Sequence, residues 1–427
     1  MALEVPQRTA TPPDHPAYGI NLTDEAIENI IAKCIPDLAG PLTVEKLHHD
    51  KSWNNRIYFI SGEPSAPRYV LKLAGRPFVP AKIENEVACL SLLGRFCPNV
   101  PTPRVIAWTT DGRSIYRSRP NDDVSAARPT IMIEGPAYGW ILMTRLPGEA
   151  LEPSELASGD RQEIARELAA IILTWRGSIP PSTHCGNLHI RSAARVEEST
   201  QVADEPMQAH STYDVHGILE IDSQYSEPLT STLGFWKHRL SWALDTLATS
   251  RVYAPNREEE RVVRLQLFID SVLPDLLPPF PETGEILPVE SFVFTHTDLS
   301  PRNILVSGRP PRMTGIVDFE YSGFFPILQE FMGKSVVSLE EDDEGWPVDM
   351  HSAILQGFED HLANGTMTGR ACDDREWKLT RTLMEMETHI APWWLSEHTP
   401  DGELESELLK ARGTVDRCLS SLEAGLK

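Results

Sequence analysis

Residues 292–325 read FVFTHTDLSPRNILVSGRPPRMTGIVDFEYSGFF, and this stretch is the basis for our predictions about the rest of the chain. The apolar triplets at 292–294, 304–306 and 315–317 are typical of short, buried strands. Glycine and proline between 308 and 311 predict a turn that joins the second strand to the third. A loop held between short strands keeps its side chains rigid, which is what a reacting site requires.

Four polar residues stand among these apolar runs: His296, Asp298, Asn303 and Asp318. Asn303 follows Asp298 by five residues, and Asp318 comes fifteen residues later, on the next hairpin. This order matches the phosphoryl-transfer template, in which a loop aspartate accepts a hydroxyl proton while an asparagine and a strand-end aspartate hold Mg²⁺. The plain alternative is a pair of hairpins with polar turn residues. The agreement of residue types, order and strand context disfavours it.

The run HTDLSPRN at 296–303, followed by IVDFE at 316–320, resembles the aminoglycoside phosphotransferase and choline-kinase-like branch of the protein-kinase fold. Members of that branch typically carry His-Gly-Asp-x-x-x-x-Asn and then Ile-Asp-Phe/Trp-Glu/Asp. Like this chain, they lack the Asp-Phe-Gly and Ala-Pro-Glu elements of protein kinases. The chain departs from the pattern at Thr297, where glycine is usual, so the loop backbone is expected to differ slightly there.

The resemblance implies a role for each polar residue of the stretch. Asp298 would be the catalytic base, and His296 would belong to the same catalytic loop, supporting it rather than reacting. Asn303 and Asp318 would bind Mg²⁺, and ATP would be the phosphate donor.

The implied fold is α+β: a two-lobed protein-kinase-like fold with a small antiparallel-sheet N-lobe and a larger, mostly helical C-lobe. We predict an N-terminal arm and helix at 1–37, a nucleotide-binding N-lobe at 38–145, and a C-lobe at 146–427 that carries the catalytic and metal loops and the substrate-binding helices. Strands are expected at 42–47, 56–60, 69–73, 105–109 and 140–144. Helices are expected at 82–96, 161–175, 235–247, 258–273, 377–394 and 404–426.

Lys72 is a charged residue inside the apolar run at 69–73, where burial without a partner would be costly. Kinase folds place their phosphate-binding lysine on the third strand, so Lys72 is the candidate; the alternative is an edge-strand lysine at the surface. Its partner is expected on the following helix, at Glu86 or Glu84. The family pattern favours Glu86, although either glutamate could instead be solvated helix surface.

Two further nucleotide contacts follow from the resemblance. The loop at 51–55 lies where kinases cover the phosphates but contains no glycine. Asn55 and backbone amides could cradle phosphates there, and a plain hairpin turn is the alternative. The segment Leu142 to Leu146 would be the adenine hinge, where backbone groups, with Leu142 and Thr144 as candidates, bind the base edge. It precedes PGEAL at 147–151, which resembles the family's Pro-Gly-Glu-x-Leu signature.

Composition narrows the possible partners. The 39 basic and 62 acidic residues give a formal charge of −23, which disfavours nucleic acid and anionic membranes. An acidic surface is compatible with a cationic substrate, but it also serves solubility. The six cysteines contain no Cys-x-x-Cys pair and are predicted to be free thiols. The N-terminus lacks an apolar signal core and no run reaches membrane-spanning length, so a cytoplasmic location is expected.

Four features lie outside the core motifs. Residues 111–135 are predicted to be an extended insertion, 191–230 an irregular surface loop and 339–349 an acidic, solvated insertion. Glu330 matches a family acidic residue that ties loops together, so we predict a structural role for it.

These residues favour two functions, and transfer of a group other than phosphate by a relative of this fold stays open as a third. The first is an ATP-dependent phosphotransferase acting on the hydroxyl of a small molecule, in which Lys72 holds the α- and β-phosphates. The second is a catalytically silent kinase-like protein that binds nucleotide or a partner. The intact Asp298, Asn303 and Asp318 count against the silent protein, whereas Thr297 and the missing glycines count for it. The fold does not fix the acceptor, and the sequence leaves the oligomeric state open.

Overall fold

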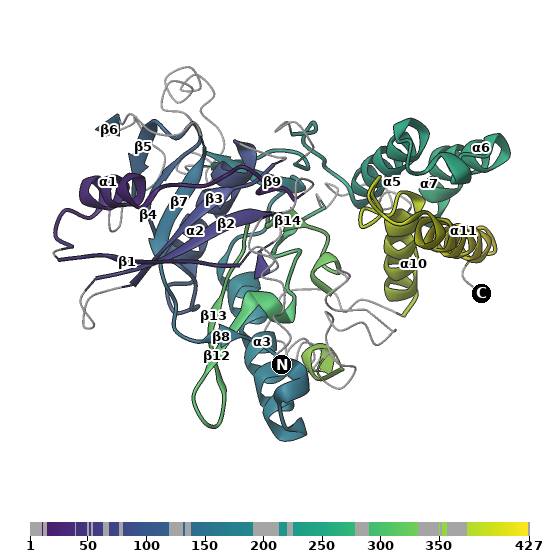
Figure 1. The fold of residues 1–427 in the computed structure, drawn as a ribbon. Helices are drawn as coiled ribbons and strands as arrows, with labels where there is room; N and C mark the ends of the chain where they lie inside the picture. Colours follow the sequence, from purple (N-terminus) through teal and green to yellow (C-terminus); the bar gives the residue numbers. More distant parts are fainter. Residues whose placement is uncertain are drawn as a thin grey trace, which may run out of the picture.

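Figure 1 shows the computed structural model, in which the N-terminal part of the chain is built on a sheet and the far end of the C-terminal part is built of helices. The structure describes residues 11, 15–38, 40–48, 51–52, 54–62, 68–76, 80–118, 131–132, 138–190, 213–219, 225–277, 290–331, 350, 352–356 and 374–425.

A seven-stranded antiparallel sheet forms the N-terminal part. Its strand order is β1-β2-β3-β7-β4-β5-β6, so β7 pairs with both β3 and β4. The strands are β1 Thr43–Lys46, β2 Asn55–Ser61, β3 Arg68–Ala74, β4 Val105–Thr109, β5 Ser114–Arg117, β6 Ile131–Met132 and β7 Trp140–Thr144.

Helices cover both faces of this sheet. Leu71 of β3 packs with α1 (Asp24–Cys34) in one apolar cluster, whereas α2 (Ala81–Phe96) shares a second cluster with Ile141 of β7. Successive side chains of a strand point to opposite faces. Lys72, the neighbour of Leu71, therefore points toward α2.

Short strands carry the stretch 292–325. The two small sheets have the orders β10-β9-β14-β11 and β13-β12-β8. Because β11 pairs with β14 and β12 with β13, the loop at 296–303 and the loop at 317–322 meet, and the Val317 N–H donates to the Asn303 carbonyl. The strands are β8 Glu149–Ala150, β9 Gly186–Ile190, β10 Tyr213–Val215, β11 Val293–Thr295, β12 Ile304–Ser307, β13 Arg312–Ile316 and β14 Gly323–Phe325.

The other helices follow the predicted periodicity closely. The helix predicted at 377–394 ends at Ile390 and not at residue 394, because Pro392 cannot continue a helix. The α-helices are α3 Ser158–Ser178, α5 Thr232–Thr249, α6 Glu259–Leu267, α7 Leu273–Leu276, α10 Asp374–Ile390 and α11 Asp401–Glu423. A π-helical turn spans Phe268–Val272, and 3₁₀ turns span Pro153–Glu155, Ala254–Asn256, Pro301–Asn303 and Gln329–Phe331.

The α+β class with an antiparallel sheet is confirmed. The predicted irregular loop at 191–230 is wrong in part, since β10 lies within it, and the predicted insertion at 111–135 contains β5 and β6. Strands of two to four residues carry too little periodicity to be recognised. The acidic stretch 339–349 lies outside the described residues, and the predicted lobe boundaries stay predictions.

Two predictions from composition can be compared with the described part of the chain. Its free cysteines are all buried: Cys34, Cys89, Cys97, Cys185 and Cys418. None of its helices has the length and apolar character needed to cross a membrane.

Candidate active site

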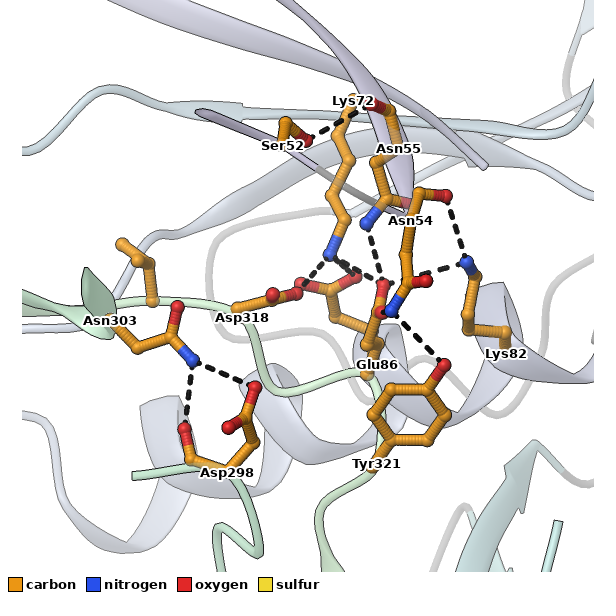
Figure 2. Close-up of polar contacts among 12 residues, drawn as sticks. Ser52, Asn54, Asn55, Lys72, Lys82, Glu86, Asp298, Asn303, Asp318 and Tyr321 are labelled. Carbon is orange, nitrogen blue, oxygen red and sulfur yellow. Dashed lines mark hydrogen bonds and ion pairs between the residues drawn. The ribbon is translucent and has the colours of Figure 1, made fainter. Parts of the chain in front are cut away.

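A cluster of opposite charges lies between the seven-stranded sheet and the loop after β13 (Figure 2). Lys72 Nζ lies 2.7 Å from Glu86 Oε2 and 2.6 Å from Asp318 Oδ1. Glu320 Oε2 is the third partner, at 3.0 Å. A second buried lysine, Lys82, lies 3.6 Å from the same Glu320 oxygen. An ammonium group has three donors, so Lys72 has one carboxylate for each.

The geometry of α2 determines which glutamate meets the lysine. Glu86 and Lys82 are one helical turn apart and share a face of the helix. Glu84 lies on another face, where its Oε2 is 3.0 Å from His189 Nε2. The structure therefore brings Glu86 to Lys72 and leaves Glu84 outside the cluster.

Burial and ion pairing oppose each other in this cluster. Burial lowers the pKa of Lys72, but the three carboxylates, led by Asp318, raise it well above its usual value. For the acidic Glu320 the directions are reversed. Burial raises the pKa of Glu320, but the Lys72 and Lys82 ammonium groups hold this pKa down at about 2. At Glu86 burial prevails over Lys72 and raises the pKa to about 7. Lys72 and Glu320 are thus ionised at neutral pH.

The sequence prediction omits Glu320, although this residue connects most of the cluster. Asn55 Nδ2 donates to Glu320 Oε2 at 2.8 Å, and Asn54 Nδ2 donates to Oε1 at 3.0 Å. The predicted phosphate contact Asn55 therefore lies at the site, with its amide nitrogen on a carboxylate. Glu320 ends the IVDFE run at 316–320, so the motif itself contained the signal. Nothing in the local pattern singles out Lys82 or Asn54.

Asp298 lies in the loop between β11 and β12, with its side chain 30% exposed. Asn303 Nδ2 donates to the Asp298 carbonyl at 2.7 Å and to Oδ2 at 3.1 Å (Figure 2). Arg302 Nη2 donates to both carboxylate oxygens at 3.2 Å. Partial burial raises the pKa of Asp298 to about 6, although Arg302 lowers it. The carboxylate is ionised at neutral pH and accessible, as a general base must be.

His296 is fully buried and connects the two loops. Its backbone N–H donates to both carboxylate oxygens of Glu330, at 3.1 and 3.0 Å. Its Nε2–H donates to the Val317 carbonyl at 3.0 Å, while its Nδ1 accepts from the Asp298 N–H at 3.3 Å. Burial lowers the pKa of His296, which favours the neutral ring that these two bonds require. His296 and Glu330 therefore have the contacts of supporting residues.

Two residues of these loops have a left-handed backbone. The φ angles are 68° at Thr297 and 71° at Asp318. A non-glycine residue loses roughly 1–2 kcal/mol in this conformation. The angle at Thr297 explains why glycine is usual in the resembled motif, and the threonine compensates because its Oγ1 donates to the Tyr321 carbonyl at 3.0 Å. At Asp318 the strain lies on the candidate metal ligand itself, which is typical of functional sites.

The predicted hinge residues lie within β7. Leu142 is fully buried in mid-strand, between Leu71 of β3 and Ala107 of β4. The Thr144 N–H donates to the Arg104 carbonyl at 3.0 Å, and its hydroxyl accepts from the Arg104 N–H at 2.9 Å. The Thr144 N–H is therefore engaged within the N-terminal part. The role of Leu142 and Thr144 as contacts to a base stays a prediction.

Oxygen atoms suited to a cation converge at the cluster. Carboxylate oxygens of Glu86, Asp318 and Glu320 lie within 4.8 Å of one another. Asn303 is adjacent, since the Val317 N–H donates to its carbonyl at 3.0 Å. Carboxylate and amide oxygens are the hard ligands that Mg²⁺ prefers, so the residues present fit this ion.

A lysine on the third strand, paired with a helix glutamate beside Asp-Asn and Asp loops, is the arrangement expected of a kinase-like fold. The chain superposes on a Haemophilus somnus 129PT protein assigned as a fructosamine-3-kinase, with a TM-score of 0.50 and 11% sequence identity. The match covers 93% of this chain and 97% of that one. At this identity the likeness shows the fold alone, and it confirms the two-lobed protein-kinase-like fold.

Two other solved structures are similar at lower TM-scores. Choline kinase from Cryptosporidium parvum Iowa II matches with a TM-score of 0.44 and 14% identity, over 94% of this chain and 95% of that one. Plasmodium vivax ethanolamine kinase matches with a TM-score of 0.46 and 11% identity, over 90% of this chain and 86% of that one. No curated protein matches significantly.

The family is shown by the sequence itself. The model of the phosphotransferase enzyme family matches residues 47–351, which is more than half of the chain. The chain therefore belongs to the phosphotransferase enzyme family, as the resemblance implied.

Proposed function

We propose that the chain uses Mg²⁺ and ATP to transfer the γ-phosphate to a hydroxyl group of a small molecule. Membership of the phosphotransferase enzyme family supports phosphoryl transfer as the reaction class. The observation that carries the proposal is the convergence of the predicted residues at one place: Lys72, Glu86, Asp298, Asn303 and Asp318.

Lys72 is the proposed ligand of the α- and β-phosphates. Its three donors now face three carboxylates, so a phosphate oxygen can exchange with one of them at little electrostatic cost. Asp318 is the partner most suited to leave, because its side chain is 30% exposed while that of Glu86 is 4% exposed. Glu86 would keep the lysine in place during this exchange.

Asn303 and Asp318 are the proposed Mg²⁺ ligands, with Glu320 as a further oxygen donor nearby. When bound, the ion neutralises charge on the transferring phosphate. The left-handed backbone at Asp318 and the His296–Val317 hydrogen bond keep this loop beside the catalytic loop.

Asp298 is the proposed base that accepts the hydroxyl proton. Its Oδ2 accepts from Arg302 and Asn303, whereas among the described contacts its Oδ1 accepts from Arg302 alone. A carboxylate oxygen accepts two hydrogen bonds, so Oδ1 can take the substrate hydroxyl while Arg302 holds the group in orientation. Catalysis would then rest mostly on positioning and electrostatics.

The acceptor is proposed as a small molecule, and a cationic one is compatible with the acidic composition. A cytoplasmic location and the exclusion of nucleic acid and membranes as partners stay predictions from the sequence.

The test is transfer of label from γ-labelled ATP to small molecules of a metabolite extract, with Mg²⁺ and purified protein. We expect a labelled product with the natural chain and labelling slower by at least about a hundredfold with Asp298→Asn. Nucleotide affinity, measured on both proteins, should be similar. A natural chain that binds MgATP but labels nothing across a broad panel of hydroxyl compounds would favour the silent binder. A chain that does not bind MgATP would exclude the phosphotransferase and the nucleotide-binding form of the silent protein.

A further inference from the structure

The segment Glu320–Ser322 begins two residues after the candidate metal ligand Asp318 and is held by two buried asparagines. Asn85 Nδ2 donates to the Glu320 carbonyl at 2.9 Å and to the Ser322 carbonyl at 3.0 Å. Asn187 Nδ2 donates to the Tyr321 carbonyl at 2.9 Å and to the same Ser322 carbonyl at 3.0 Å. All three carbonyls of the segment are therefore bonded by side chains from other elements, namely α2 and β9.

Both asparagines are fixed in orientation. Asn85 is fully buried, and its Oδ1 accepts from the Leu188 N–H of β9 at 2.6 Å. Asn187 is 2% exposed, and its Oδ1 accepts from the Leu219 N–H at 2.8 Å. A buried amide whose donors and acceptor are all satisfied cannot rotate without losing several hydrogen bonds at once. Each asparagine therefore acts as a rigid link.

The segment that they hold connects the two strained residues of the site. The Thr297 hydroxyl donates to the Tyr321 carbonyl, and the Ser322 hydroxyl donates to the His296 carbonyl at 3.0 Å. A left-handed backbone at residues such as Thr297 and Asp318 persists only where surrounding contacts fix it. Asn85 and Asn187 supply part of that restraint from outside the two loops.

The same links fix α2. Asn85 directly precedes Glu86, so its bonds to the metal loop and to β9 set the position of that glutamate relative to Lys72. Tyr225 adds a contact one turn earlier on the helix, since its hydroxyl lies 3.1 Å from the Ala81 carbonyl. In protein kinases the position of the corresponding helix controls whether the lysine–glutamate pair forms.

We propose that Asn85 and Asn187 are positioning residues that assemble the nucleotide and metal site before any substrate binds. They hold Asp318 in its left-handed backbone and Glu86 against Lys72. This inference rests on the proposed function, because it assumes that Asp318 binds the metal of a metal–nucleotide complex.

The test uses the full chain with Asn85→Asp and Asn187→Asp. Each change preserves shape but replaces two donors with an oxygen that faces two carbonyl oxygens. Mn²⁺ binding in the presence of a non-hydrolysable ATP analogue is measured by electron paramagnetic resonance. We expect each variant to need about tenfold more Mn²⁺ than the natural chain, the loss typical when residues that orient a metal ligand are removed. Thermal unfolding without ligand is recorded alongside.

Asn256→Asp is the matched control. Asn256 is also buried, and its Nδ2 donates to the Leu408 carbonyl at 2.8 Å, within the C-terminal helices. The substitution Asn256→Asp should lower the melting temperature and leave Mn²⁺ affinity unchanged. This result would separate a positioning role from a general loss of stability. If an aspartate variant does not fold, Asn85→Ser or Asn187→Ser replaces it, because the shorter side chain leaves room for a bridging water.

The outcomes distinguish failure of the positioning role from failure of the proposed phosphotransferase function. Unchanged Mn²⁺ affinity in the folded Asn85 and Asn187 variants would overturn the positioning role and leave the proposed function standing. A natural chain that fails to bind Mn²⁺ with the nucleotide analogue would overturn the proposed function, and the inference with it. A loss of affinity equal to that of the Asn256 control would also overturn the positioning role.

Discussion

The charge cluster beneath the seven-stranded sheet and the ion pairs between α6 and α11 use the same kinds of side chain in opposite settings. In the cluster the side chains of Lys72 and Glu320 are 8% and 1% exposed. On the helices Arg264 and Glu423 meet at 2.7 Å with their side chains 41% and 36% exposed.

The two settings differ in the free energy that is needed to remove the charges from water. Removing an ion from water into a protein interior costs several kcal/mol, and its partner recovers this only with good geometry. An exposed pair contributes about 0–1 kcal/mol and is screened by salt. A buried cluster with three carboxylates on one lysine is therefore poor evidence for stability and strong evidence for a site, whereas the helical pairs need no function to explain them.

The largest effect is expected at Asp298. Asp298→Asn keeps the shape but removes the charge that accepts the proton, and general-base catalysis typically contributes about 10²–10⁴-fold. Phosphate transfer should therefore slow by roughly 2.7–5.4 kcal/mol of barrier, at about 1.36 kcal/mol per tenfold. Affinity for MgATP should stay similar.

The control comes from the helical region. Asp416 also pairs with an arginine, with its Oδ2 2.9 Å from Arg261 Nη2, so Asp416→Asn makes the same chemical change in the C-terminal helices. Its turnover should equal that of the natural chain. Equal losses in Asp298→Asn and Asp416→Asn would remove the catalytic assignment of Asp298.

The next largest effect is expected at Lys72. Lys72→Met keeps the apolar stem and removes the ammonium group, so kcat/KM for ATP should fall by about 10²–10³, or roughly 2.7–4 kcal/mol. Glu86→Gln should give a smaller loss of the same kind, and Glu84→Gln, whose carboxylate faces His189, should be nearly silent. Steady-state kinetics with varied ATP measure all three. A greater loss in Glu84→Gln than in Glu86→Gln would contradict the pairing seen here.

A third effect concerns the metal. At a hundredfold excess over its Kd, MgATP should raise the free energy of unfolding of the natural chain by about 2.7 kcal/mol, because it binds only the folded state. Asp318→Ala should lose the part of this gain that depends on Mg²⁺. Thermal unfolding with ATP, with and without Mg²⁺, measures the difference. An undiminished Mg²⁺ effect in Asp318→Ala would place the ion on other ligands.

A fourth effect is expected at Asp111, whose carboxylate, among the described contacts, accepts hydrogen bonds within the turn at 109–114. Burial raises its pKa, but several hydrogen bonds, including those from the Ser114 and Arg113 N–H groups, together hold the pKa down at about 2. The unfolded value is about 3.9, so the stabilisation is complete above that pH and is lost as the pH falls through about 2. Because Asp111 is exposed, Asp111→Asn should cost only about 1 kcal/mol at pH 7.

The measurement for Asp111 is urea unfolding of both proteins at several pH values. The free-energy gap between them should be constant from pH 7 to pH 5 and should narrow at pH 3. A free-energy gap that widens as the pH falls would show that folding does not lower the pKa of Asp111.

The smallest effect is expected for an exposed pair. Arg264→Gln breaks the contact with Glu423 and should change the free energy of unfolding by less than about 1 kcal/mol, with turnover unchanged. The difference should shrink further in high salt. Urea unfolding at low and high ionic strength measures it. A loss as large as that expected for a buried pair would erase the contrast between the two regions.

The sequence alone determined the parts of this protein that local patterns encode. The stretch 292–325 carries the residue types, spacing and strand context of a phosphoryl-transfer site. Lys72 is recognisable because it is the charged residue in the apolar run at 69–73. Periods of two and about 3.6 residues placed the main strands of the N-terminal sheet and most of the long helices, because burial of one face imposes those periods on neighbouring residues.

The tertiary structure decided which distant residues meet. Lys72 and Asp318 are 246 positions apart in the chain, and Asn54 and Glu320 are 266 apart. The selection of Glu86 over Glu84 depends on the rotation of α2 against the sheet, which the helical pattern permits but does not fix.

Buried polar contacts were decided by the fold as well. Asn85 and Asn187 resemble ordinary helix and strand residues in the sequence, and only the approach of α2 and β9 to the segment Glu320–Ser322 gives them partners. A local pattern records how a residue is exposed along its own helix or strand. It does not record which carbonyl another segment will bring within hydrogen-bonding distance, because that depends on the packing of the whole chain.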